Sequence, residues 1–378
     1  MGRESLVKFS KMAKPYLAVI FLQFGYAGLA IVVKFALNEG MSPYTYSVYR
    51  NLFAAVAVAP FAIFFERKVR PKMTISTFLK IMVLGLIGPV MQLDLFYSGM
   101  QYTTATFTAS LYNVLPAITF VLAWILRIEK VNVKKVHSQA KVLGTAVTIG
   151  GAMIMTLVKG PNIGLPWTKH TNLIQTATAL HSQQDIMKGA VMIIAACFLW
   201  ASFIILQGIT LKSYPAGLSL TTLICTAGAL QGSVVALVAE RKNLAAWALH
   251  WNTKLLAMVY SGVICSGVTY YLSGIIIKEK GPVFVTAFNP LSTIIAAIMG
   301  TFILADQLSL GIALGAVAIM VGLYMVIWGK KHDNVPPEST AGSRVVPVDE
   351  LPSTLVKPAT NQEPSDTTTT VVAGDEAV

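Results

Sequence analysis

Charged residues are scarce in this sequence. Only 12% of its 378 residues are Asp, Glu, Lys or Arg, whereas 55% are hydrophobic, and the mean hydropathy is +0.65. Soluble domains carry about 25% charged residues. A chain with so few cannot cover its surface with polar groups, which excludes a soluble globular protein. Because about 20 consecutive apolar residues cross a bilayer as a helix, the sequence predicts an all-α membrane protein surrounded by a lipid bilayer.

Cysteine is rare too, and the sequence lacks the motifs of enzyme chemistry. The three cysteines lie inside apolar runs at no metal-binding spacing, which is typical of buried structural thiols. The five histidines fall in predicted loops or in the C-terminal segment. No glycine-rich phosphate loop and no Ser/His/Asp arrangement is present. We therefore expect no catalytic residue, no metal and no cofactor, and the missing nucleotide motif excludes a single-chain ATP-driven pump.

Acidic residues are concentrated near the C-terminus. Residues 333–378 hold eight acids and two bases, so the rest of the chain has 27 bases and nine acids. This basic excess comes without an aromatic-basic groove pattern, and we expect no nucleic acid partner. The bases lie in short loops between apolar runs. With the N-terminus in the cytoplasm, the cytoplasmic segments hold 19 Lys and Arg against seven on the opposite side, which predicts that both termini are cytoplasmic.

Ten apolar runs are long enough to be transmembrane helices. We place them at 16–36, 44–65, 78–99, 105–126, 142–159, 189–210, 216–239, 255–277, 283–304 and 310–329. The predicted organisation is a cytoplasmic N-terminus (1–15), a first five-helix unit (16–159), a polar connecting loop (160–188), a second five-helix unit (189–331) and a tail (332–378). The tail is acidic and rich in Pro, Ser and Thr, so we expect it to be disordered.

The two five-helix units are copies of one another. Phe107–Glu129 and Phe284–Asp306 have the same length, and "FFERK" (64–68) and "VAERK" (238–242) end equivalent runs. A frame of Leu-Gly, a second Gly seven residues on and a Lys fifteen residues on also recurs: Leu143-Gly144, Gly151 and Lys159, then Leu314-Gly315, Gly322 and Lys330. Because each copy crosses the membrane an odd number of times, the second copy has the inverted membrane topology. The sequence thus predicts a 5+5 inverted repeat, as in many secondary transporters, with the substrate held between the halves.

Several runs in both halves belong to a recognisable pattern. They are "LQFGYAGLAIVVKFALNEGMSP", "APFAIFFERKVRPKMT", "TATFTASLYNVLPAITFVLAWILRIEKV", "LQGITLKSYPAGLSLT" and "KGPVFVTAFNPLSTIIAAI". Over about residues 14–331 the chain resembles the plant nodulin-like or WAT-related UMAMIT amino-acid transporters. These belong to the drug/metabolite transporter superfamily and have two EamA domains. The resemblance implies ten helices and amino-acid transport in either direction. For the location it implies the plasma membrane in most cases, whereas some relatives lie in the tonoplast and carry auxin.

One acid, Asp94, lies deep inside an apolar run. Many relatives have an acid before the proline of this span, where the present chain has Gly88 and Pro89. A buried charge in hydrocarbon costs several kcal/mol unless it is paired, hydrated or protonated. Asp94 is either a structural carboxyl group or a group that contacts a substrate ammonium or carries a proton. Gln92 and Tyr97 lie on the same helix, and Tyr97 shares the face of Asp94.

Arg50 is the matching cation within a span. It could reach the membrane interface or brace a helix end; the alternatives are that it attracts a substrate carboxylate or pairs with Asp94. Other polar or aromatic groups at this depth are substrate-site candidates, and prolines in both halves are expected to break helices beside the site. Glu129 and Asp306 close their spans and are expected to anchor helix ends or to gate. The complete list of further candidates is Gln23, Asn113, Trp200 and Asn289, with the helix-breaking residues Pro116 and Pro290.

These residues suit a zwitterion, because it needs an acceptor for its ammonium, donors for its carboxylate and a tolerant surface for its side chain. We therefore predict a facilitator for a broad set of neutral and polar amino acids that works by alternating access. The first alternative is a carrier of auxin or another organic anion in the tonoplast. The second is a membrane scaffold acting through the tail. A homodimer and a monomer remain open alternatives for the assembly.

Overall fold

The computed structural model describes residues 3–38, 40–103, 105–129, 136–158, 162–163, 183–241, 247–249, 252–303 and 308–333. They belong to one unit, which ends at Val335. Nearly all of them are helical, which confirms the predicted all-α membrane protein. Most of the predicted loop 160–188 and of the predicted tail 332–378 lies outside the described residues.

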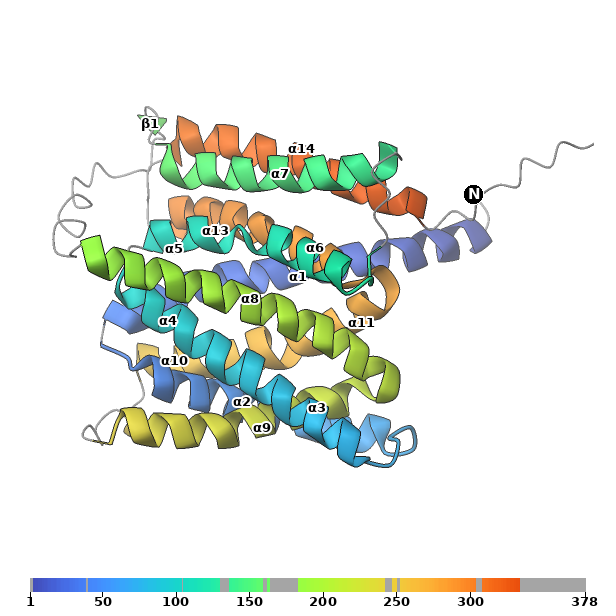
Figure 1. The fold of residues 1–378 in the computed structure, drawn as a ribbon, viewed down its shortest axis with the longest axis vertical. Helices are drawn as coiled ribbons and strands as arrows, with labels where there is room; N and C mark the ends of the chain where they lie inside the picture. Colours follow the sequence, from blue (N-terminus) through green and yellow to red (C-terminus); the bar gives the residue numbers. More distant parts are fainter. Residues whose placement is uncertain are drawn as a thin grey trace, which may run out of the picture. The chain divides into compact units, whose positions relative to one another are not determined.

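The first half of the chain forms five helical rods, two of them interrupted (Figure 1). Their elements are α1 (Arg3–Asn38), α2 (Pro43–Glu66), α3 (Ile75–Gly85), the π-helix η1 (Leu86–Gln92), α4 (Leu93–Gln101), α5 (Ala105–Tyr112), α6 (Leu115–Ile125) and α7 (Val136–Leu157). A strand of two residues, β1 (Asn162–Ile163), follows and pairs antiparallel with β2 (Leu308–Ser309).

The second half repeats this order with the same interruptions. Its elements are α8 (Gln183–Ser213), α9 (Gly217–Ala239), α10 (Thr253–Tyr260), the π-helix η3 (Ser261–Val268), α11 (Thr269–Lys280), α12 (Pro282–Ala287), α13 (Asn289–Ile303) and α14 (Leu310–Asp333). A π-helix interrupts the third rod of each half, and a non-helical turn interrupts the fourth. Proline explains part of this pattern, since Pro89 in η1 lacks the N–H that an α-helix needs.

Nine stretches of the described chain are long and apolar enough to cross a membrane. They are Ala13–Val33, Pro43–Glu66, Ile75–Gln101, Phe107–Ile125, Gln184–Ser213, Gly217–Ala239, Thr253–Lys280, Pro282–Met299 and Leu310–Lys330. The tenth predicted span, 142–159, falls in α7, whose described part is a long helix but is not among the nine. Large apolar side chains are exposed along these helices, Phe64 by 82% and Phe302 by 68%, which suits a surface bathed in lipid.

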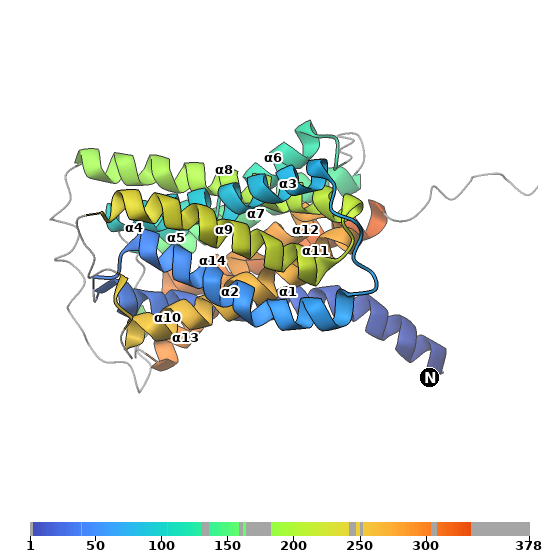
Figure 2. The ribbon, with the colours of Figure 1, turned by 90° about the horizontal axis from the view of Figure 1, so that it is seen from below.

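Two pairs of equivalent helices from the two halves lie against each other. Figure 1 shows α7 alongside α14, and Figure 2 shows α2 near α9; both pairs are in extensive contact. Glycines permit the close approach of α7 and α14: a Cβ on Gly151 would lie 3.0 Å from the Gly315 carbonyl oxygen. Small residues in this role are common between membrane helices. Equivalent helices meet in this way when an axis of approximate two-fold symmetry passes between them.

Candidate substrate-binding site

Arg50 lies in the third turn of α2 and is only 3% exposed. Its Nε donates a 2.8 Å hydrogen bond to Ser266 Oγ, and its guanidinium donates a second, of 3.3 Å, to the Cys265 carbonyl oxygen. Both acceptors belong to the π-helix η3. This helix reaches α2 because Gly262 has no side chain; a Cβ there would lie 2.8 Å from Phe53 Cβ.

No carboxylate among the described residues forms an ion pair with Arg50. This corrects two of the sequence-based alternatives. Arg50 does not extend to a membrane interface, because its side chain is enclosed by other helices, and it does not pair with Asp94. Its charge is therefore buried with two neutral oxygen partners. An uncompensated charge in such a setting costs several kcal/mol, so the position favours a ligand that brings a negative charge.

Several tyrosines lie near the Arg50 guanidinium. Five lie within electrostatic range of it, and we call them, together with Arg50, the Arg50 cluster; they are Tyr26, Tyr46, Tyr97, Tyr112 and Tyr270. They come from α1, α2, α4, α5 and α11. The Tyr46 and Tyr97 rings meet edge to face, with hydroxyl oxygens 3.5 Å apart. The Tyr26 hydroxyl is buried and has no hydrogen-bond partner among the described residues.

Asp94 is the second residue of α4 and lies on the α2 side of the same interior. It is 8% exposed, its carboxyl group lies beside the Ser47 hydroxyl, and its Oδ1 has no hydrogen-bond partner in the described chain. The π-helix before it fixes this position. In η1 the Pro89 carbonyl oxygen accepts hydrogen bonds from Ser47 Oγ at 2.8 Å and from Asn51 Nδ2 at 3.0 Å. Tyr97 follows Asp94 by three residues, so α4 carries the carboxyl group beside the Arg50 cluster.

Of the four predicted amide residues, Gln23, Gln92 and Asn113 are buried and Asn289 is half-buried. Gln23 Oε1 and Gln92 Oε1 are buried without hydrogen-bond partners in the described residues. The two asparagines stand at the helix breaks. Asn113 precedes α6 and accepts a 3.3 Å hydrogen bond from Thr293 Oγ1 of α13, while Asn289 begins α13 beside the Tyr112 hydroxyl. The broken fourth rods of the two halves thus contact each other through these asparagines, whose contact with a substrate stays a prediction.

The remaining predicted residues lie at the edges. Trp200 of α8 packs in the apolar core against Phe203 and Tyr270, with ring centroids 5.2 and 6.0 Å apart. Pro116 begins α6 and Pro290 lies in the first turn of α13, and both are buried. These positions place the three side chains in the walls of the interior. Their direct contact with a substrate stays a prediction.

Glu129 ties three helices together at one end of the bundle. Its Oε1 lies 3.1 Å from Lys141 Nζ of α7, and its Oε2 lies 3.1 Å from Lys330 Nζ of α14. Lys330 also donates a 2.9 Å hydrogen bond to the Lys280 carbonyl oxygen at the end of α11. Such a network fits the predicted anchoring of helix ends. Asp306, the equivalent acid of the second half, lies outside the described residues.

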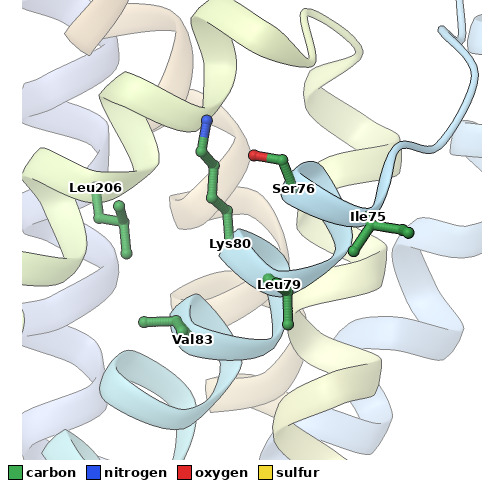
Figure 3. Close-up of a pocket in the computed structure, with 6 residues that line it drawn as sticks. All are labelled: Ile75, Ser76, Leu79, Lys80, Val83 and Leu206. Carbon is green, nitrogen blue, oxygen red and sulfur yellow. The ribbon is translucent and has the colours of Figure 1, made fainter.

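Among the described residues, two hollows bear on the question of access to this interior. The larger, of about 460 Å³, is a groove between α3 and α8 lined by Ile75, Ser76, Leu79, Lys80, Val83 and Leu206 (Figure 3). It contains none of the predicted site residues, and its lining is mostly apolar. The smaller, of about 120 Å³, reaches from Glu66 and Lys278 at the surface to Gln207 and Tyr270. It therefore leads toward the Arg50 cluster.

Comparison with known proteins identifies the family. The model of the EamA-like transporter family matches residues 13–157 and, a second time, residues 187–328. The chain belongs to the EamA-like transporter family. Two relatives from Arabidopsis thaliana, WAT1-related protein At2g39510 and WAT1-related protein At2g37460, are 57% and 54% identical to it. Each alignment covers 85% of this chain, with 86% of the first relative and 84% of the second.

A solved crystal structure shares the fold. It is 12% identical, has a TM-score of 0.61, and the match covers 85% of this chain and 99% of that one. EamA proteins are membrane transporters and not enzymes, so the predicted class is confirmed. The duplicated family match, with the nearly all-helical structure, also agrees with the predicted transporter fold.

Several residues of the interior were not apparent from the sequence. Ser47 and Ser266 look like ordinary small polar residues of membrane helices, yet one lies beside Asp94 and the other binds Arg50. Tyr270 was one tyrosine among 13 in the sequence. Ser266 lies within the π-helix η3 and Tyr270 follows it, so their positions depend on a π-turn that changes the α-helical register. No sequence pattern predicts such a turn in η3, which contains no proline.

Proposed function

We propose that the protein transports neutral and polar amino acids across the membrane by alternating access, in the manner of the UMAMIT carriers it resembles. One observation supports this most strongly. Among the described residues, the Arg50 guanidinium is buried without a carboxylate partner, and Asp94 Oδ1 is buried without a hydrogen-bond partner. A zwitterionic amino acid supplies the missing charge for both.

The chemistry of each group suits one end of the substrate. Guanidinium groups form strong charge-assisted hydrogen bonds with carboxylates, so Arg50 would bind the substrate carboxylate. Asp94 would accept a hydrogen bond from the ammonium. The rings of Tyr97 and Tyr112 offer an apolar surface with hydroxyl groups that accommodates side chains of different size and polarity. Broad selectivity among neutral and polar amino acids follows from a site of this kind.

The inverted repeat provides the movement. Each half presents an equivalent face to the axis of approximate symmetry, so exchanging the conformations of the halves turns an inward-facing site into an outward-facing one. Facilitated and bidirectional flux is what the resemblance to the UMAMIT carriers implies. The distribution of Lys and Arg favours cytoplasmic termini, and the plasma membrane is the proposed location.

An organic-anion carrier, including an auxin carrier of the tonoplast, is the second candidate. The specific observation in its favour is that Arg50 alone could hold an organic carboxylate among the tyrosine rings. The two candidates differ in whether the Asp94 carboxylate contributes to substrate binding. An organic anion gains nothing from that carboxylate, because like charges repel.

Flux measurements in proteoliposomes with labelled amino acids test the proposal. Arg50→Gln removes the cation, and we expect at least about a tenfold loss of flux at low substrate concentration, the effect of losing a charged hydrogen bond. Arg50→Lys keeps the charge but not the forked geometry, so it should recover only part of the flux. Asp94→Asn should also lower flux.

The matched control is Arg67→Gln, which removes an exposed arginine at the end of the same helix. It should transport like the wild type. If Arg50→Gln and Asp94→Asn fold normally and transport amino acids at the wild-type rate, the site lies elsewhere. Loss of flux in Arg50→Gln with unchanged organic-anion flux in Asp94→Asn would instead favour the second candidate. The assembly, as a monomer or homodimer, does not enter this test.

A further inference from the structure

Glu66, the last residue of α2, holds the start of α9. Its Oε1 accepts a 2.9 Å hydrogen bond from the Leu218 backbone N–H, and its Oε2 accepts one of 2.7 Å from the Ser219 N–H. These N–H groups have no partner within their own helix. The N-cap residue of α9 is Ala216, which has no side-chain acceptor to offer them. The Glu66 carboxylate, from another helix, therefore caps the N-terminus of α9. Its negative charge also interacts favourably with the positive end of the α9 dipole.

A second side chain reinforces this contact. Arg70 Nε donates a 3.1 Å hydrogen bond to Ser219 Oγ, and its terminal nitrogen donates one of 3.4 Å to the Ala62 carbonyl oxygen of α2. Three of these hydrogen bonds join the end of α2 and the loop after it to the start of α9, and the fourth holds Arg70 against α2. We call the end of the bundle where they lie the Glu66 face. The sequence predicts that this face is cytoplasmic.

Glu240 makes the corresponding contact at the other end of the same two helices. It is the C-cap residue of α9, and its Oε1 accepts a 2.6 Å hydrogen bond from Ser42 Oγ. Ser42 is the N-cap residue of α2, where a serine hydroxyl ordinarily caps its own helix. Here it makes no such bond and reaches the neighbouring helix instead. We call this end the Glu240 face.

The two contacts are related by the internal repeat. Glu66 and Glu240 are the acids of "FFERK" and "VAERK". Each ends the second helix of its own copy and reaches the start of the second helix of the other copy. Because the second copy is inverted, equivalent contacts stand at opposite faces of the membrane. The same pair of helices is therefore fastened at both ends by one carboxylate from each half.

The seam between these helices runs past the candidate substrate site. Arg50 lies between the two ends of α2, and Cys225 of α9 is within electrostatic range of it. The hollow of about 120 Å³ is lined by Glu66, by Gly217 at the start of α9, and by Tyr270 of the Arg50 cluster. Releasing Glu66 from α9 would widen this hollow along a path from the Glu66 face to the site.

We infer that Glu66 and Glu240 are gate residues. The contacts of Glu66 keep the path from the Glu66 face to the Arg50 cluster closed, and the contact of Glu240 keeps the path from the opposite face closed. The inference rests on the alternating access proposed above. Alternating access requires that one path be open while the other is closed, and a symmetric pair of carboxylate contacts can be released one at a time. Both are closed in this structure.

A thiol beside the site can report which path is open. Cys265 is buried, and its carbonyl oxygen binds Arg50. With Cys197 and Cys225 replaced by alanine, Cys265 is the sole thiol of the chain. A membrane-impermeant maleimide added to one side of sealed vesicles then measures access to the site from that side. No substrate is needed, so a wrong substrate assignment would not affect the result.

Glu66→Ala should speed the labelling of Cys265 about tenfold from the Glu66 face and not from the Glu240 face, the shift that loss of a charged hydrogen bond produces in a two-state equilibrium. Glu240→Ala should do the reverse. Ser42→Ala, which removes only the donor to Glu240, should act in the same direction as Glu240→Ala. Two other acids provide matched controls and should leave labelling unchanged: Glu279→Ala on the Glu66 face, where Glu279 is exposed, and Asp185→Ala on the Glu240 face, where Asp185 pairs only with Lys188 of its own helix among the described residues.

Size-exclusion chromatography identifies variants that fail to fold. Should Glu66→Ala be one of them, Glu66→Gln keeps the shape of the side chain and one acceptor oxygen, and should increase labelling from the Glu66 face to a smaller extent. The inference is overturned if the folded variants label at the control rate, label from the wrong face, or label equally from both. Those outcomes would leave the flux experiments on Arg50 and Asp94 untouched, so the two proposals can fail separately.

Discussion

Gly144 of α7 and Gly322 of α14 face each other so closely that neither can carry a side chain without displacing the other's backbone. A Cβ on Gly144 would lie 2.7 Å from the Gly322 carbonyl oxygen, and a Cβ on Gly322 would lie 2.6 Å from the Gly144 carbonyl oxygen. Gly144 is the first glycine of the repeated frame and Gly322 is the second. Two antiparallel copies of one frame meet in this crossed order only around a two-fold axis, as an inverted repeat requires.

Gly322→Ala should therefore destabilise the α7–α14 pair. The added methyl group would collide with Thr148 and with the Gly144 backbone, and overpacking of this kind costs about 1–3 kcal/mol. We expect a lower apparent Tm in a thermal size-exclusion assay. Gly150→Ala is the matched control, because a Cβ on Gly150 meets nothing within 4 Å. Equal melting of the two variants would contradict the close contact.

Glu129→Gln should destabilise the protein as well. The substitution takes away the carboxylate that contacts two ammonium groups, one of them on Lys141, which is 1% exposed. Breaking a buried ion pair from one side costs about 3 kcal/mol, and the apparent Tm should fall. Asp185→Asn breaks the exposed pair with Lys188, which is worth less than about 1 kcal/mol. A stable Glu129→Gln variant would show that the network is not an anchor.

Tyr26→Phe separates stability from substrate binding. The Tyr26 hydroxyl is buried without a partner in the described structure, so removing it should leave the unfolding temperature unchanged or raise it. If a substrate satisfies this hydroxyl, the apparent KM for amino-acid flux should rise about fivefold, as for one lost hydrogen bond. Tyr324→Phe, at an exposed position of α14, is the control. An unchanged KM would exclude Tyr26 from the site.

Deletion of residues 336–378 tests whether the tail has a role in transport. Its composition is too polar and acidic to form a packed core, and the helices that hold the proposed site end before it. Flux per molecule in proteoliposomes should match that of the full chain. A folded, truncated protein without flux would instead support the alternative in which the protein acts through its tail.

The sequence predicted the fold class well, for physical reasons. Hydropathy marks helices that must satisfy their own backbone in lipid, and the glycine frame marks the inverted repeat because close helix contact admits only small residues. Hydropathy could not locate the interruptions inside spans, since the apolar composition continues through η1 and η3. The sequence therefore predicted one regular helix for the span that contains Asp94.

The sequence predicted individual residues of the candidate site but not the contacts between them. Buried charge is costly in lipid, so Arg50 and Asp94 were recognisable from their positions alone. Whether they pair depends on which helices lie between them, and the sequence of either helix does not contain that information. The paired glutamates show the same limit: the "ERK" repeat is visible in the sequence, but the contact of each with the other half requires the three-dimensional arrangement of α2 and α9.

The most direct test of the central claim asks whether the site requires both charges of the substrate. Uptake of labelled leucine into proteoliposomes would be challenged with unlabelled leucine, with 4-methylpentanoate, which lacks the ammonium, and with leucinamide, which lacks the carboxylate. We predict that leucine competes at least about tenfold better than either analogue, because each analogue leaves Arg50 or Asp94 without its partner. Equal competition by 4-methylpentanoate and leucine would contradict the account and identify an organic-anion carrier.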